Sequence, residues 1–95
     1  MEEGVVKMKE KKFLQSYAYT DFGNFLISTA YRKASVVLEI WYYETFAWKL
    51  NDKMQNDGNI IADNSGAINI NNAIKQHTAV VEALICTGEW IDNED

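Results

Sequence analysis

The chain has 95 residues, 47% of them hydrophobic, and a formal net charge of −5 at pH 7. This length allows one domain with a modest core and excludes a second domain, while the hydrophobic share argues against global disorder. The single cysteine, Cys86, excludes an internal disulfide bond, and the apolar runs are too short for a membrane-spanning helix. With no signal-peptide pattern at its start, we expect a cytoplasmic protein that does not associate with membranes.

The two ends of the chain differ from the rest in composition. Residues 1–12 alternate acidic and basic side chains and predict a flexible tail, and residues 91–95 form an acidic tail. We expect a single helical domain over residues 13–90. A solvated, flexible tail is the simpler explanation of the basic run in the first tail. The same run supplies the candidate DNA contacts, which are Lys7, Lys9, Lys11 and Lys12.

The segment 13–33 predicts a first helix. Thr20 or Asp21 can cap it, and apolar residues follow at helical spacing. A short polar stretch around Ser35 is all that separates it from the next segment, so the sequence allows either two helices or one long bent helix.

The segment 35–56 is rich in aromatic residues and predicts a second helix. As a strand it would bury Glu44 in the middle of an apolar face, which is unfavourable for a charged group. As a helix it carries an unbroken apolar stripe with spacings of four and three residues. That stripe consists of Val36, Ile40, Tyr43, Ala47, Leu50 and Met54.

A second apolar stripe lies nearly opposite the first in this helical interpretation. A helix that is apolar on two sides must be covered on both, which predicts a homo-oligomer or another protein partner. The first helix of the same chain is the alternative cover. The interface candidates are Leu38, Trp41, Tyr42, Thr45 and Trp48.

In the segment 56–70, Asn56-Asp57-Gly58 is a stop signal for the preceding helix, and Asn59–Ala62 favours a strand. Asn64-Ser65-Gly66 is a typical turn sequence before residues 67–70, so a short β-hairpin is predicted here. This hairpin would be either a recognition tip or a plain connector. The last helix is predicted from Asn72 to Thr87, with Asn71 or Asn72 as its cap and Gly88 directly after its end. Together these elements predict a mainly α fold, in which a short β-hairpin connects the last two of three helices into a helical hairpin.

Three residues invite a chemical interpretation. His77 lies on the apolar side of the last helix, where a hydrogen-bonded core imidazole is the simplest explanation, and Cys86 is expected to be a small buried hydrophobe. Glu44 is either a solvated residue on the helix flank or a partner of His77. With one histidine and one cysteine the chain has no metal-ligand set, and it lacks nucleotide-binding and nucleophile motifs. We therefore expect no catalytic site, no metal and no cofactor.

About half of the chain resembles the central region of the P27 family of phage small terminase subunits. In that family a tyrosine-rich helix ends in a glycine, a short piece with isoleucine and a second glycine follow, and another helix begins with an asparagine-containing turn. The matching residues here are Tyr42, Tyr43, Gly58, Ile61, Gly66, Asn71, Asn72, Ala73, Ile74, Lys75, Ala83, Leu84 and Gly88. The chain departs from the family at Asn72, where proline is usual, and in its acidic end, where the family has a basic tail.

The resemblance implies a non-catalytic, oligomeric phage adaptor that recognises viral DNA for packaging and works with a large terminase subunit. The alternative is a small acidic inhibitor or sequestering protein from a phage or mobile element. Such a protein would bind a host protein or small ligand through Trp41, Tyr42, Trp48 and the hairpin. An enzyme is the third class of function, and it would use His77.

Overall fold

The protein is described by a computed structural model, which defines residues 10–33 and 40–91. These residues form a four-stranded antiparallel sheet followed by one helix, so the predicted mainly α fold is wrong. The elements are β1 (Glu10–Thr20), β2 (Gly23–Lys33), β3 (Trp41–Leu50), β4 (Asn56–Ala67) and α1 (Ile70–Thr87).

The sheet is a meander, in which each strand pairs with the next strand along the chain, in the order β1-β2-β3-β4. The first turn is tight: Thr20 pairs with Gly23, and the Thr20 hydroxyl accepts a hydrogen bond from the backbone N–H of Phe22. Gly23 has φ +132°, a conformation that favours glycine. The predicted cap of a first helix at Thr20 or Asp21 is therefore the turn of a β-hairpin, and residues 13–33 are not helical.

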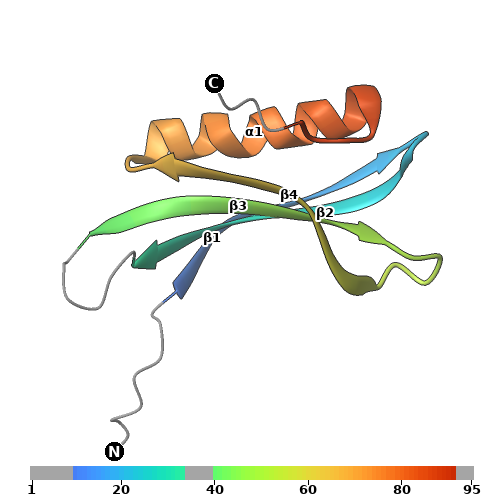
Figure 1. Ribbon diagram of the computed structural model, residues 1–95, viewed down its shortest axis with the longest axis horizontal. Helices are drawn as coiled ribbons and strands as arrows, with labels where there is room; N and C mark the ends of the chain where they lie inside the picture. The colour runs from blue at the N-terminus through green and yellow to red at the C-terminus, as the bar shows by residue number, and fades with distance from the viewer. Residues whose placement is uncertain (1–9, 34–39, 92–95) are drawn as a thin grey trace, which may run out of the picture.

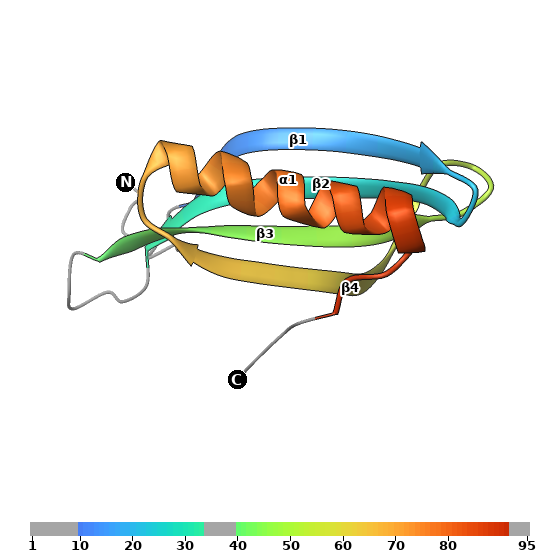
Figure 2. The same cartoon turned by 90° about the horizontal axis from the view of Figure 1, so that it is seen from above.

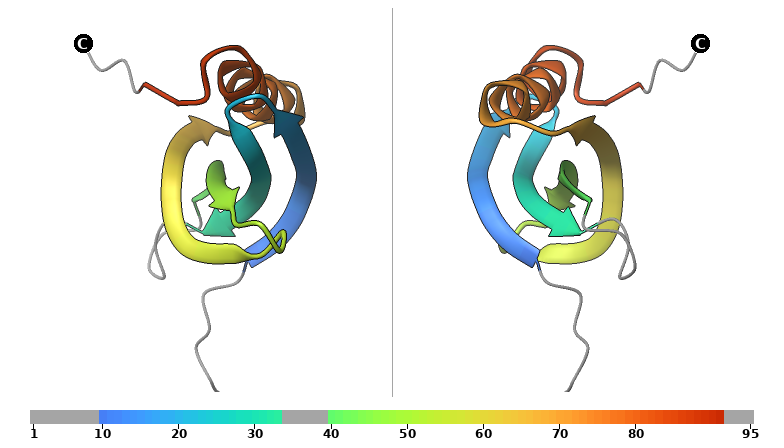
Figure 3. Two further views of the ribbon diagram at one scale, coloured as in Figure 1. Left: turned by 90° about the vertical axis from the view of Figure 1, so that its right-hand side faces the viewer. Right: turned by 90° about the vertical axis from the view of Figure 1, so that its left-hand side faces the viewer.

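Helix α1 covers one face of the sheet and contacts all four strands (Figure 2). The sheet is strongly twisted, as the end-on views in Figure 3 show. The core lies between α1 and this sheet face, which we call the helix side. It includes Phe25, Ile27, Ala47, Val80 and Leu84, each at most 1% exposed.

Aromatic rings extend the helix side beyond this core at the end where α1 begins. The rings of Phe13 and Tyr43 lie 5.1 Å apart between centroids, and Tyr31 lies 4.7 Å from Tyr43. Trp41 stacks on Tyr31 at 4.9 Å. These contacts tie β1, β2 and β3 together at the first turn of α1, where Ala73 belongs to the same buried cluster as Tyr43.

Helix α1 has well-defined caps. The Asn69 side chain accepts a hydrogen bond from the backbone N–H of Asn72, so the cap lies slightly before the predicted Asn71 or Asn72. Gly88 ends the helix in the left-handed conformation, which confirms its predicted position. A Cβ atom on Gly88 would lie 2.5 Å from Cβ of Phe22, so glycine also allows the β1–β2 turn to approach the helix end.

In the segment predicted as a helix over 35–56, residues 41–50 form strand β3 and residues 51–55 form the turn after it, while residues 35–39 lie outside the described residues. In a strand Glu44 is buried, which by itself disfavours a strand here. Glu44 is indeed only 9% exposed, but Arg32 on the neighbouring strand β2 contacts its carboxylate at 2.7 Å. A buried carboxylate is tolerated when it is paired in this way. Because both faces of β3 carry large apolar residues, the same sequence also matched helical spacing.

The predicted hairpin over 56–70 is also wrong, since Asn56–Ala67 is one irregular strand, β4. Its pairing with β3 shifts register three times, and Gly58 and Gly66 have φ of 92° and 117°. The asparagines and glycines that suggested turns instead produce bulges. After α1, residues 88–91 run past β4, as Figures 1 and 2 show, and Trp90 packs against the core.

Candidate binding surface

The sheet face opposite α1, which we call the open face, carries a row of apolar side chains across all four strands. Strand alternation and the observed register place one residue of each strand in this row. The outer members are the most exposed, Tyr17 at 49% and Ile60 at 52%. We call Tyr17, Leu26, Trp48 and Ile60 the apolar row.

Further aromatic side chains flank the apolar row on the open face. Tyr19 stacks beside Tyr17 with 6.4 Å between ring centroids, and Phe46 lies 6.0 Å from Trp48. Among the residues that the structure describes, no secondary-structure element covers this side of the sheet. Partly exposed aromatic side chains gathered on one sheet face are typical of a binding surface.

A polar group adjoins the aromatic residues of the open face. Arg32 donates from Nη1 to Glu44 Oε1 at 2.7 Å, and the Tyr42 hydroxyl donates to the same oxygen at 3.3 Å. The Arg32 guanidinium also lies 6.0 Å from the centre of the Phe46 ring. Asp63 on β4 lies close enough to Glu44 to affect its pKa. Arg32 thus pairs with Glu44 at the edge of an aromatic surface, and a second acidic side chain lies close to the same carboxyl group.

Burial and the neighbouring Asp63 raise the pKa of Glu44 above its usual value, against the opposing effect of Arg32. Burial also raises the pKa of the Tyr42 hydroxyl, and the nearby Glu44 charge adds to the effect. An added positive charge at this place would relieve the repulsion between the carboxylates.

On the helix side a chain of polar side chains crosses the core. His77 of α1 makes a hydrogen bond with Ser16 Oγ through Nε2 and with Thr29 Oγ1 through Nδ1, each at 2.8 Å. Thr29 in turn contacts Thr45 Oγ1 at 2.5 Å. The expectation that His77 is a hydrogen-bonded core imidazole is confirmed, since its exposure is 3%. Burial lowers the pKa of His77.

Gln76 connects this chain to the irregular end of the β3–β4 ladder. Its Nε2 donates to the Tyr43 carbonyl and to Thr45 Oγ1, and its Oε1 accepts from the backbone N–H of Ala67, all at 3.1 Å. The strands shift register between Tyr43 and Glu44, so the Gln76 amide satisfies backbone groups near the bulge. We call Ser16, His77, Thr29, Thr45 and Gln76 the core network.

The contact between Ser16 and His77 resembles a nucleophile and its base, but its surroundings suit a structural role. The side chain that orients the imidazole is the neutral hydroxyl of Thr29, where catalytic triads use a carboxylate that stabilises the imidazolium. Burial also disfavours the charged imidazole, which is the form that a catalytic base takes after it accepts a proton. The core network therefore satisfies buried polar groups and fixes the helix over the sheet.

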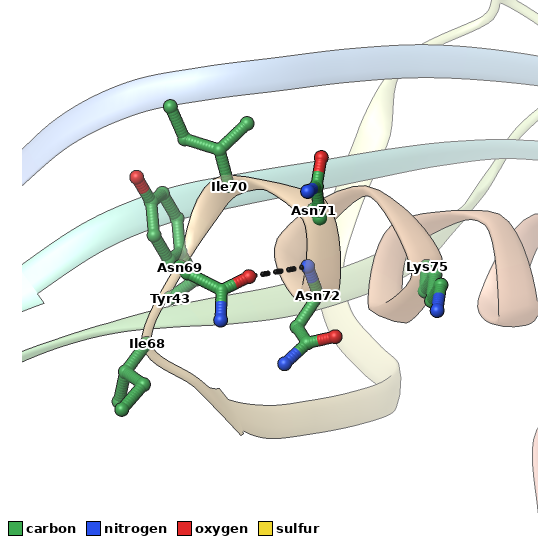
Figure 4. A pocket seen from close by; sticks show the side chains of 7 residues that line it. All are labelled: Tyr43, Ile68, Asn69, Ile70, Asn71, Asn72 and Lys75. Atoms are coloured by element: carbon green, nitrogen blue, oxygen red, sulfur yellow. Dashed lines mark hydrogen bonds between the residues drawn. The ribbon is translucent and has the colours of Figure 1, made fainter.

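A shallow hollow of about 610 Å³ opens beside the start of α1, as Figure 4 shows. The Asn69 carbonyl accepts from the backbone N–H of Ala73, and its side chain accepts from Asn72, so two N–H groups of the first helical turn are already satisfied. The backbone N–H groups of Asn72 and Ala73 are therefore not free to bind an anion in the hollow. Its lining consists of Tyr43, Ile68, Asn69, Ile70, Asn71, Asn72 and Lys75.

The predicted interface residues do not share one surface. Tyr42 and Trp48 lie on the open face, whereas Thr45 is fully buried in the core network and Trp41 stacks on Tyr31 on the helix side. Leu38 lies outside the described residues. The stripe that suggested an interface thus mixed residues from both faces of a strand.

The remaining sequence predictions have different outcomes. Lys11 and Lys12 are exposed at the start of β1, while Lys7 and Lys9 fall outside the described residues. Cys86 is exposed, so its predicted burial is wrong. Glu44 is neither a solvated flank residue nor a partner of His77, because it lies on the opposite face of the sheet and pairs with Arg32.

Residues 10–33 and 40–91 contain no cluster of three or more histidine, cysteine or acidic side chains suited to a metal ion. In the same part of the chain no helix combines the length and apolar character that crossing a membrane requires.

Sequence reasoning missed Arg32, Asp63 and Tyr17 as members of the open face. Their spacing in the sequence carries no signal, because the register of four strands brings them together. Alternating apolar residues at Tyr17, Tyr19 and Leu26 would have indicated one face of a hairpin if residues 13–33 had been read as strands.

Comparison of the chain with protein-family models, curated proteins and solved structures gave no significant match.

Proposed function

We propose that this chain is a small, non-catalytic binding protein that sequesters a partner protein through the open face of its sheet. The observation that carries the proposal is the apolar row, which crosses all four strands on the side that α1 leaves uncovered. This function corresponds to the inhibitor or sequestering protein considered as an alternative from the sequence. An enzyme would need a reactive group with access to substrate, and the one histidine is committed to the core network.

The DNA-packaging role implied by the terminase resemblance receives no support from the fold. The resemblance matched Tyr42 and Tyr43 to a tyrosine-rich helix, and here they belong to strand β3. The helical hairpin of that interpretation is absent from the described residues. The net charge of −5 also opposes attraction to phosphate backbones.

The dimensions of the open face suit a protein partner. Four strands about 4.8 Å apart and about ten residues long present roughly 600 Å² of sheet face. Specific protein interfaces bury on the order of 800 Å² on each partner, so the face and its flanks reach the lower end of that range. Tyrosine and tryptophan are also the side chains that most often dominate binding energy.

The charge of the open face points to a partner with basic side chains. Glu44 pairs with Arg32, Asp63 lies close to Glu44, and the Phe46 ring lies beside Arg32. A lysine or arginine of the partner would neutralise the excess negative charge and contact the ring. We therefore expect a partner segment in which a basic residue follows or precedes aliphatic or aromatic residues.

Selection from a random-peptide display library on the immobilised protein tests this function. The expected consensus combines Arg or Lys with a large apolar residue. Trp48→Ser should weaken the selected peptides by roughly thirtyfold, the loss typical of a central aromatic contact. Ile85→Ser is the matched control, because Ile85 is 51% exposed on α1 and away from the open face. Peptides without such a consensus, or peptides that bind Trp48→Ser as tightly as the native chain, would contradict the proposal.

A further inference from the structure

The two outer edges of the sheet differ in a way that bears on self-association. Edge strands of monomeric proteins are usually protected by bulges, short length or covering segments, since an exposed edge can pair with another strand. Strand β4 shows such protection: its ladder shifts register three times, and residues 88–91 run beside it (Figure 2). Among the described residues β1 has a strand neighbour on one side alone, and its register is continuous from Leu14 to Thr20.

The register of the first hairpin shows which backbone groups of β1 point outward. The two-residue turn makes Thr20 and Gly23 a hydrogen-bonded pair, and such pairs alternate along an antiparallel ladder. The N–H and C=O groups of Gln15, Tyr17 and Tyr19 consequently point away from β2. Three residues of one regular strand thus offer six backbone groups to a further strand.

We propose that β1 pairs with β1 of a second copy of this chain, antiparallel and around a two-fold axis at Tyr17, to form a continuous eight-stranded sheet. In this register Tyr17 faces Tyr17 of the second copy, and Gln15 faces Tyr19. Both helices lie on the same side of the joined sheet, since the axis is perpendicular to it. The inference does not rest on the proposed function.

Charge complementarity favours a second copy as the occupant of the edge. Strand β1 begins with the sequence Glu10-Lys11-Lys12, and Asp21 follows its other end; the side chains of Lys11, Lys12 and Asp21 are exposed. The pairing around Tyr17, with the bulge between Lys12 and Leu14 taken into account, sets Lys12 of each copy opposite Asp21 of the other, and Lys11 follows one residue further along, on the other face of the sheet. The two-fold axis produces this contact twice. Opposite charges on neighbouring strands stabilise pairing, and like charges oppose it.

The apolar row supplies a second argument. Tyr17 is its outermost member on β1 and remains 49% exposed in the single chain. The proposed pairing sets the two Tyr17 side chains against each other on the open face and joins two apolar rows end to end. Burial of these rings adds the aromatic contact that isolated edge pairing lacks.

Two charge variants test the pairing without altering the fold. Asp21→Lys places positive charges together at both contacts, and the double variant Lys11→Glu, Lys12→Glu places negative charges together. Each variant alone should dimerise about tenfold or more weakly than the native chain in low salt. A mixture of the two should form a mixed dimer of native affinity, because each of its two contacts again joins opposite charges. Native mass spectrometry distinguishes the mixed dimer from either parent.

The backbone contribution is tested by Gln15→Pro, which removes an outward N–H group, with Gln15→Ala as its matched control. Proline is compatible with an edge strand when its nitrogen faces solvent, so the β1–β2 ladder should persist. Sedimentation equilibrium should show a dimer for Gln15→Ala and a monomer for Gln15→Pro. If Gln15→Pro fails to fold, the charge variants decide alone. A native chain that remains monomeric, or a dimer lost in Trp48→Ser and kept in the charge variants, would overturn the inference.

Discussion

Replacement of Thr29 by valine tests the core network most directly. Valine has nearly the shape of threonine, so the change removes a hydroxyl and leaves the packing of a fully buried position almost intact. The hydroxyl contacts Thr45 at 2.5 Å and His77 at 2.8 Å. Its loss removes two hydrogen bonds and leaves His77 Nδ1 without its partner, while Thr45 keeps its bond from Gln76.

The expected cost follows from these contacts. Two buried hydrogen bonds contribute about 2 kcal/mol together, and an unsatisfied buried group adds roughly 1–3 kcal/mol. The additional buried methyl group offsets about 0.8 kcal/mol of this. A net loss of about 2–4 kcal/mol is large beside a total stability of roughly 5–14 kcal/mol for a chain of this length.

Urea unfolding monitored by circular dichroism measures the loss. The midpoint of Thr29→Val should fall by about 1 M or more at unchanged slope. Thr78→Val is the matched control, since it makes the same chemical change on the exposed side of α1 and should stay within about 0.5 kcal/mol of the native chain. A Thr29→Val protein as stable as this control would show that the network does not hold the helix on the sheet.

Three other predictions concern titration and backbone conformation. Because burial lowers the pKa of His77 in the folded state, the unfolded chain binds the extra proton first. The free energy of unfolding should therefore fall as pH drops below 6.5, the usual pKa of histidine. The urea midpoint should fall with pH over this range in the native chain, and this dependence on pH should be lost in His77→Gln. The carboxyl carbon of Glu44 should titrate above 4.5 in an NMR experiment, and Asp63→Asn should move its midpoint down, whereas an unchanged midpoint would refute their contact. Gly88→Ala should destabilise by about 1–3 kcal/mol and by more than Gly66→Ala. Both positions have positive φ, but of the two only Gly88 has a close neighbour: an added Cβ there would lie 2.5 Å from Cβ of Phe22. Equal shifts of the thermal midpoint in the two variants would therefore contradict the close approach of Phe22 to Gly88.

The last helix was readable from sequence because its signals are local. Apolar residues recur at helical spacing, and Gly88 follows the final turn at the place where a left-handed residue ends a helix. The position of His77 on the buried side follows from the same pattern. Its partners do not, since Ser16 and Thr29 lie 61 and 48 residues away in the chain.

The sheet was missed for a physical reason that one residue illustrates. Glu44 ruled out a strand as long as it was considered alone, and the residue that makes its burial tolerable belongs to another strand, β2. A similar ambiguity affected Asp21, because a short acidic residue before an apolar run suits a helix cap and a hairpin turn equally well. Gly23, two residues later, was the stronger signal, since it adopts a backbone conformation that other residues avoid.

The asparagine-rich segment misled for a different reason. Asn56 and Gly58 do form a local turn-like contact, in which the Asn56 side chain accepts from the Gly58 N–H at 2.6 Å. This contact occurs within strand β4, where Asn56 pairs with Leu50 and Ile60 pairs with Trp48 of β3. Tertiary pairing thus overrides local turn preference.

The meander order has a consequence for how the molecule forms. Each strand finds its partner among residues that directly precede or follow it, which favours rapid assembly of the ladder. Helix α1 follows the four strands in the chain, so it leaves the ribosome after them, and until then Phe25 and Ile27 have no cover from it on their side of the sheet. The newly made chain therefore passes through a stage in which the sheet is nearly complete and exposes apolar side chains on both faces, before helix α1 covers one of them.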